Sequence, residues 1–170
     1  MGNNVRLAET TGPNVYPNSH TITADLTIPA SGAEGVLAAA GGANGGWTLY
    51  VQDGKLTYHY NLADFEHNTV QAKDPLPSGK VGVKLEYVAK GLKPGGTLNT
   101  GALVRLFVNG NLAGEGSVGS AMLRHGIEPF EVGRDSISPV SPDYKAKGSF
   151  PFTGTIEKIR FDIAAVGSNR

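Results

Sequence analysis

The sequence predicts an all-β protein made of two antiparallel sheets packed face to face, and three observations support this prediction. Apolar and polar residues alternate with a period of two along most of the chain, which is the pattern of half-buried strands. The 170 residues include 24 glycines and 10 prolines, a content typical of short strands joined by many turns. Apolar spacing of three and four residues does not persist over any segment of about 12 residues, as a helix would require.

The first expected strand covers residues 20–28, "HTITADLTI", where Ile22, Ala24, Leu26 and Ile28 share one face. Residues 1–19 before it are polar and contain two prolines, so we expect a lead-in segment or linker there. A single β-sandwich domain is then predicted over residues 20–165, with a short tail over residues 166–170. "EGVLAAAGG", residues 34–42, is an apolar run that fits a buried strand.

The glycine-rich stretch "GGANGG", residues 41–46, stands directly before the only tryptophan and invites comparison with a phosphate loop. A phosphate loop needs its glycines to open onto a helix, so that backbone N–H groups face the anion. Here they open onto an alternating segment that starts at Trp47 and is joined to the next one by Asp53-Gly54, a two-residue hairpin signal. The stretch is therefore predicted to be a corner between strands, with Trp47, Tyr58 and Tyr60 in the core.

The second half of the chain repeats these signals. Residues 80–88, "KVGVKLEYV", alternate as a strand, and residues 102–116 form a second hairpin with Asn109-Gly110 at its turn. "FEVGR", residues 130–134, is a short strand. Residues 120–130 can hold one helical turn at most, and residues 90–101 are predicted to be a mobile loop.

The last expected strand lies within residues 152–164, "FTGTIEKIRFDIA", and its pattern is irregular. Ile156 has the opposite parity from Ile159, Phe161 and Ile163. Because a one-residue slip turns every side chain to the other face, this pattern predicts either a β-bulge near Glu157-Lys158 or a strand buried on both faces.

Composition excludes several classes of partner. Fifteen basic and fifteen acidic residues balance, so no global field attracts nucleic acid or an anionic membrane. No apolar run approaches the roughly 20 residues that span a bilayer. The first residues lack the apolar core of a signal peptide, and both a cytoplasmic and a periplasmic location remain open.

Six stretches resemble, in order and spacing, the C-terminal module of a family of bacterial arylsulfatases. They are "SHTITADLTIP", "AEGVLAAAGGANGGWTLYVQDGKLTYHYN", "PLPSGKVGVKLEY", "VRLFVNGNLAGEG", "VGRDSISPVSPDY" and "PFTGTIEKIRF", and the resemblance runs from Asn14 to Ile163. It implies a jelly-roll sandwich of the concanavalin A-like or laminin G-like kind, which follows a sulfatase catalytic domain. It also implies a sulfatase domain as partner, in cis or in trans.

The residues that would make the chain a sulfatase are missing. The family's nucleophile comes from a Cys/Ser-x-Pro-Ser-Arg motif, and the nearest string, "SFPFT" at residues 149–153, lacks the Ser-Arg pair. No equivalent of the metal-binding aspartates is found. No segment matches a Glu-x-Asp-x-x-Glu pattern, which would place a glycosidase pair of acids on one strand. Glu131 and Asp135 share a parity, but Gly133 and the expected strand end after Arg134 predict a turn there. We therefore expect no enzymatic activity.

The four histidines, His20, His59, His67 and His125, do not have the spacing of a structural zinc site, so no transition-metal site is expected. His59 alternates outward beside Thr57 and Asn61, which predicts a solvated or cross-strand polar role.

Residues 134–144, "RDSISPVSPDY", contain the candidate binding residues. Asp135 and Asp143, with carbonyls of this loop, are weak candidates for calcium, which takes six to eight oxygen ligands. The favoured alternative is that Asp135 caps a turn and Arg134 pairs with a carboxylate. No cofactor is therefore expected beyond this possibility of calcium.

Exposed aromatic side chains are the remaining signal for carbohydrate binding. Tyr50, Tyr144 and Phe65 are the candidates for a stacking surface, and the candidate binding residues are thus Tyr50, Arg134, Asp135, Asp143 and Tyr144. The leading hypothesis is a non-catalytic accessory domain that packs on or positions a sulfatase domain. The alternative is a lectin-like module that binds carbohydrate or another polyanion.

Overall fold

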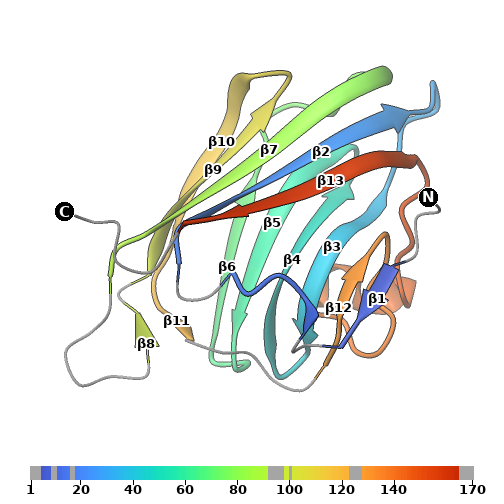
Figure 1. Ribbon diagram of the computed structural model, residues 1–170. Helices are drawn as coiled ribbons and strands as arrows, with labels where there is room; N and C mark the ends of the chain where they lie inside the picture. Colours follow the sequence, from blue (N-terminus) through green and yellow to red (C-terminus); the bar gives the residue numbers. More distant parts are fainter. Residues whose placement is uncertain are drawn as a thin grey trace.

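The computed structural model describes residues 5–8, 11–15, 18–91, 98, 99, 101–122 and 128–164, which form two antiparallel β-sheets stacked face to face (Figure 1). The five-stranded sheet lies in front in this view, and the six-stranded sheet lies behind it. The two-sheet architecture predicted from the sequence is confirmed. Within the described ranges, no helix has the length and apolar character needed to cross a bilayer.

The six-stranded sheet has the strand order β1-β12-β3-β4-β5-β6. Its strands are β1 (Val5–Leu7), β3 (Gly35–Gly42), β4 (Gly45–Gln52), β5 (Lys55–Leu62), β6 (Glu66–Gln71) and β12 (Phe130–Val132). Two of them, β1 and β6, were not expected from the sequence, and β1 lies inside the segment predicted to be a lead-in.

The five-stranded sheet has the order β10-β9-β7-β2-β13. Its strands are β2 (His20–Ile28), β7 (Gly79–Ala89), β9 (Ala102–Val108), β10 (Asn111–Val118) and β13 (Thr155–Ile163). A separate pair consists of β8 (Leu98–Asn99) and β11 (Ala121–Met122). Residues 123–127, in the segment expected to hold one helical turn at most, and residues 92–97 and 100, in the predicted loop over residues 90–101, lie outside the described residues.

The hydrophobic core lies between the two sheets and is built from the inward side of each alternating strand. Leu85 and Leu106 from one sheet and Trp47, Tyr58 and Tyr60 from the other are at most 1% exposed. Burial on this scale, at roughly 25 cal/mol per Å² of apolar surface, is the main stabilising contribution in a sandwich of this size. The predicted placement of these three aromatic residues in the core is confirmed.

A second apolar cluster covers the outer face of the six-stranded sheet. The segment after β12 folds back over that face and contains η2, a 3₁₀ helix (Pro142–Lys147) whose N-cap is Ser141. The cluster comprises Val36, Ala39 and Tyr50 from the sheet and Val140, Tyr144 and Phe150 from this segment. The strand β3 is therefore buried on both faces, as its continuous apolar run predicts.

The hairpin turns form where the sequence places them. Asp53 and Gly54 have φ values of 52° and 73°, and Asn109 and Gly110 have values of 49° and 82°. All four values lie in the left-handed region that two-residue hairpin turns require. The glycine-rich stretch forms the corner between β3 and β4, where Gly41 has a φ of 88°.

The irregular last strand contains a β-bulge. The register between β13 and β2 shifts between Ile156 and Lys158, so Glu157 is the extra residue. Ile156 is 7% exposed, whereas Ile159 and Phe161 are partly buried and pack against the core. After the bulge, Ile159 and Phe161 face the core again. A β-bulge was one of the two predicted alternatives, and it is the one observed.

The substitution Gly41→Ala tests the reading of the glycine-rich stretch as a steric corner. A Cβ atom at this position would lie 2.2 Å from the carbonyl oxygen of Gly45, in addition to the positive φ. We expect a loss of about 3 kcal/mol in the free energy of unfolding, measured by urea denaturation.

The matched control is Gly32→Ala, at a φ of 85° with no heavy atom within 4 Å of the added Cβ. This variant should lose only about 1 kcal/mol, the cost of the left-handed backbone. Equal losses in the two variants would contradict a steric role for the corner.

Candidate functional site

The aromatic residues expected to form a stacking surface divide into two groups. Phe65 is 91% exposed, as predicted. Tyr50 and Tyr144 are 1% and 0% exposed, so the prediction that they are exposed is wrong. Tyr50 does lie on the outer face of its strand, opposite to Leu49 and Val51, but the segment that contains η2 covers this face. The two rings meet edge to face at 5.1 Å and are not available to a ligand.

The acids of this segment hold it against the sheet. Asp135 accepts hydrogen bonds from the Tyr144 hydroxyl at 2.6 Å and from the Val140 amide at 2.8 Å. Asp143 accepts one from the Tyr50 hydroxyl at 2.8 Å. Asp135 thus caps the turn that leads to Val140. This is the role that the sequence favours over calcium binding.

Arg134 pairs with a carboxylate, as the sequence predicts. Its Nε lies 3.7 Å from Glu131 Oε1, and Glu131 itself is 2% exposed. Among the described residues, no group of three or more histidine, aspartate or glutamate side chains converges as a metal ion would need.

Burial dominates the ionisation of Asp135. Desolvation raises its pKa from 3.8 to about 6, the Tyr144 and Val140 hydrogen bonds act in the opposite direction, and the charges of Glu131 and Glu128 add to the rise. Between about pH 4 and pH 6, the Asp135 carboxyl group is therefore mostly protonated in the folded state and mostly ionised in the unfolded state. It follows that the contribution of this group to stability falls as the pH rises from about 4 to 6.

Two histidines that are eight positions apart meet on the outer face of the β5–β6 hairpin. His59 is 2% exposed, its Nδ1 lies 2.8 Å from Thr69 Oγ1, and its Nε2 lies 3.0 Å from His67 Nδ1. His67 Nε2 in turn lies 3.2 Å from Asp64 Oδ1. Of the two roles predicted for His59, solvated or cross-strand polar, the cross-strand polar role is the one observed. Burial is the main cause that lowers its pKa to about 4, with the neighbouring His67 contributing.

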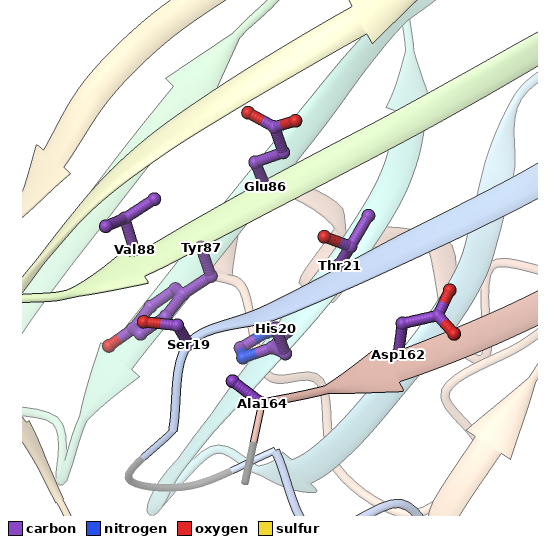
Figure 2. Close-up of a pocket in the computed structure, with 8 residues that line it drawn as sticks. All are labelled: Ser19, His20, Thr21, Glu86, Tyr87, Val88, Asp162 and Ala164. Carbon is purple, nitrogen blue, oxygen red and sulfur yellow. The ribbon is translucent and has the colours of Figure 1, made fainter. Parts of the chain in front are cut away.

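A pocket of about 200 Å³ lies at one end of the five-stranded sheet, where β2, β7 and β13 run side by side (Figure 2). The register places Thr21 opposite Glu86 on one side and opposite Asp162 on the other. These three polar side chains form a row across three strands on the outer face. Neighbouring strands are about 4.8 Å apart, so the Cα atoms of the two acids are separated by about 10 Å.

The other side of the pocket is less polar. Val88, which is 44% exposed, and Ala164 line it (Figure 2). Ser19 closes this end, because its hydroxyl accepts the Ala89 amide at 3.0 Å and its carbonyl accepts the Ala164 amide at 2.9 Å. The pocket therefore combines hydroxyl and carboxylate oxygens with a small apolar wall.

Two buried rings support the pocket from the core side. His20 and Tyr87 are paired across β2 and β7, and their rings stack at 4.7 Å with 16° between their planes. Burial lowers the pKa of His20 to about 4, while the carbonyls of Asn18 and Val15 oppose this change. Its Nδ1 lies 3.0 Å from the Asn18 carbonyl oxygen, and its buried Nε2 makes no hydrogen bond within the described part of the chain.

The two carboxylates of the pocket are held in ion pairs. Lys84 Nζ lies 2.7 Å from Glu86 Oε1, and Arg160 Nη2 lies 2.7 Å from Asp162 Oδ1. The side chains of Glu86 and Asp162 are 29% and 47% exposed, and each lies against a cation. Their remaining oxygen positions can accept hydrogen bonds from a ligand.

The sequence did not single out the residues of this pocket. Thr21, Glu86 and Asp162 come from segments far apart in the chain, and only the order of the strands brings them together. The one available signal was parity, since each is a polar residue on the outward side of its strand.

Solved structures with a similar fold include laminin G-like and carbohydrate-binding domains. Domains LG4-5 of the mouse laminin alpha1 chain superpose with a TM-score of 0.62 at 16% identity, over 96% of this chain and 40% of that chain. The CBM40 of Ruminococcus gnavus IT-sialidase, bound to alpha2,3 sialyllactose, gives a TM-score of 0.58 at 14% identity over 97% and 90%. Sheep galectin-11 in complex with glycerol gives 0.52 at 8% identity over 95% and 98%.

These likenesses show a jelly-roll sandwich of the laminin G type, and at such low identities they show the fold alone. The predicted concanavalin A-like fold is thereby confirmed. The chain spans less than half of the laminin chain that it matches. No model of a known protein family and no curated protein matches the chain, so the sulfatase resemblance stays a prediction.

The variant Asp135→Asn tests whether the buried carboxylate destabilises the fold at neutral pH. The amide oxygen of asparagine can still accept the bonds from Tyr144 and Val140, but it carries no charge to desolvate. We expect the variant to gain about 1 to 3 kcal/mol at pH 7 and little at pH 4, measured by urea denaturation across this range. The exposed Asp25→Asn is the control and should stay within about 0.5 kcal/mol of the parent. A loss of stability that is equal at every pH would contradict the assignment.

Proposed function

We propose that this chain is a non-catalytic carbohydrate-binding module whose sugar site is the pocket between β2, β7 and β13. The observation that carries the proposal is the row of Glu86, Thr21 and Asp162 facing the apolar wall of Val88 and Ala164. A sugar ring presents hydroxyl groups around its edge and C–H groups on its faces. A pocket for one ring therefore needs fixed oxygen acceptors beside a small apolar surface, and this pocket provides both.

The similar structures support the same class of function. The Ruminococcus gnavus domain is bound to sialyllactose, and it has the same sandwich architecture over nearly its whole length. Because a fold hosts many functions, the weight of the proposal rests on the pocket and its chemistry. The non-catalytic part of the proposal is supported by the sequence, which lacks the Cys/Ser-x-Pro-Ser-Arg nucleophile motif of the sulfatases that it resembles.

The accessory role beside a sulfatase domain rests on the sequence resemblance. Such a role calls for an exposed apolar surface that a partner covers. The exposed large apolar side chains of the described residues, Val5, Phe65, Val88, Leu112, Ile137 and Ile163, come from six separate segments of the chain. No family model and no curated protein links the chain to a sulfatase, so carbohydrate binding has the stronger support.

Glycan-array screening followed by calorimetry tests the proposal with the variant Thr21→Val. This change removes the central hydroxyl of the pocket and preserves the shape and strand preference of the side chain. The loss of one hydrogen bond should weaken glycan binding about 3- to 10-fold, without turnover of glycan or aryl sulfate.

The matched control is Thr23→Val, which lies on the same strand and face but does not line the pocket. Its affinity should equal that of the parent. Binding to no glycan on the array, or equal losses in both variants, would refute the proposed site.

A further inference from the structure

We infer that the pocket selects a neutral sugar unit and discriminates against sugars that carry a carboxylate or a sulfate. This inference rests on the proposed function and adds the charge class of the ligand. Two carboxylates line the pocket, whereas the nearest cations are not among its lining residues.

The charged side chains among the described residues that line the pocket are both carboxylates, Glu86 and Asp162. They stand on either side of Thr21, so a ligand seated over this threonine lies between two negative charges. An anionic group placed there would face both carboxylates, and the cations beside them, Lys84 and Arg160, are already engaged in ion pairs. Hydroxyl groups, in contrast, would donate hydrogen bonds to carboxylate oxygens that are already charged, which are among the stronger hydrogen bonds in proteins.

The nearest cations are already paired with the two carboxylates of the pocket. Lys84 binds Glu86 at 2.7 Å and lies over the Phe107 ring at 4.1 Å, so it is held on the next row of the sheet. Arg160 directs both Nε and Nη2 at Asp162 Oδ1, at 2.9 and 2.7 Å. An acidic sugar would have to break one of these ion pairs to obtain a counter-charge, whereas a neutral sugar leaves both intact.

The floor of the pocket contributes no positive charge near neutral pH. His20 is held neutral by burial, and its Nε2 makes no hydrogen bond within the described residues. Cation-based recognition of a carboxylate is therefore absent from every described wall of the pocket.

The test uses glycan pairs that differ only in charge, for example lactose and 3'-sialyllactose, together with neutral oligosaccharides and their sulfated forms. Each is titrated into the full chain by calorimetry or NMR at 20 and 300 mM salt. We expect the neutral member of the bound pair to bind at least tenfold more tightly, with the gap narrowing at high salt because screening weakens the repulsion.

The double variant Glu86→Gln/Asp162→Asn provides the second arm. Its amide oxygens still accept hydrogen bonds, but the pocket loses both negative charges, and Lys84 and Arg160 lose the charge of their ion-pair partners. The preference for the neutral member should fall at least threefold. The control Glu115→Gln removes a carboxylate of the same sheet that does not line the pocket, and it should leave the preference unchanged.

The outcomes separate the two proposals. If no member of any pair binds, the proposed function fails, and the inference fails with it. If the charged member binds as tightly as the neutral one, or if the double variant keeps the full preference, the inference is overturned while carbohydrate binding stands.

Discussion

The register of β2 between β7 and β13 is the constraint on which the rest of this structure depends. Inward side chains of β2 complete the core between the sheets, and outward side chains form one row of the exposed face. A one-residue slip would exchange the two sets, placing Thr21 in the core and Ile22 in the pocket. Core stability and pocket chemistry are therefore fixed by the same pairing, in which Thr21 meets Glu86 and Asp162.

The two sheets differ in what becomes of their outer faces. The outer face of the five-stranded sheet carries ion pairs and threonines, whereas that of the six-stranded sheet is covered by the segment containing η2. Covering a face requires partners for its polar groups, because an unpaired buried group costs about 1–3 kcal/mol. Asp135 and Asp143 meet that requirement for the hydroxyls of Tyr144 and Tyr50. Asp135, Asp143 and Tyr144, which suggested a binding loop in the sequence, thus hold the segment containing η2 against the sheet.

The sequence was sufficient to predict the fold, because alternation and turn chemistry are local signals. The two Asx-Gly turns and the inward aromatic residues followed from neighbours along the chain, and the bulge at Glu157 was one of two alternatives that the local pattern left open. The candidate site was not predictable in the same way. Alternation shows that Tyr50 points away from Leu49, but it does not show that η2 covers that side. Strand order pairs residues more than a hundred positions apart, and local periodicity does not predict it.

The ion pairs on the outer face of the five-stranded sheet also help to explain why this surface would suit a sugar. A free carboxylate in water is strongly hydrated, and a ligand must displace that water before it gains a hydrogen bond. Lys84 and Arg160 already hold Glu86 and Asp162 in fixed positions, so less side-chain freedom is lost when a hydroxyl group binds. Each carboxylate keeps acceptor capacity beyond its ion pair, because ionised oxygens offer about four lone-pair sites. The same pairs that hold these acceptors in place also occupy the cations, so preorganisation for hydroxyl groups and selection against anions arise from one arrangement.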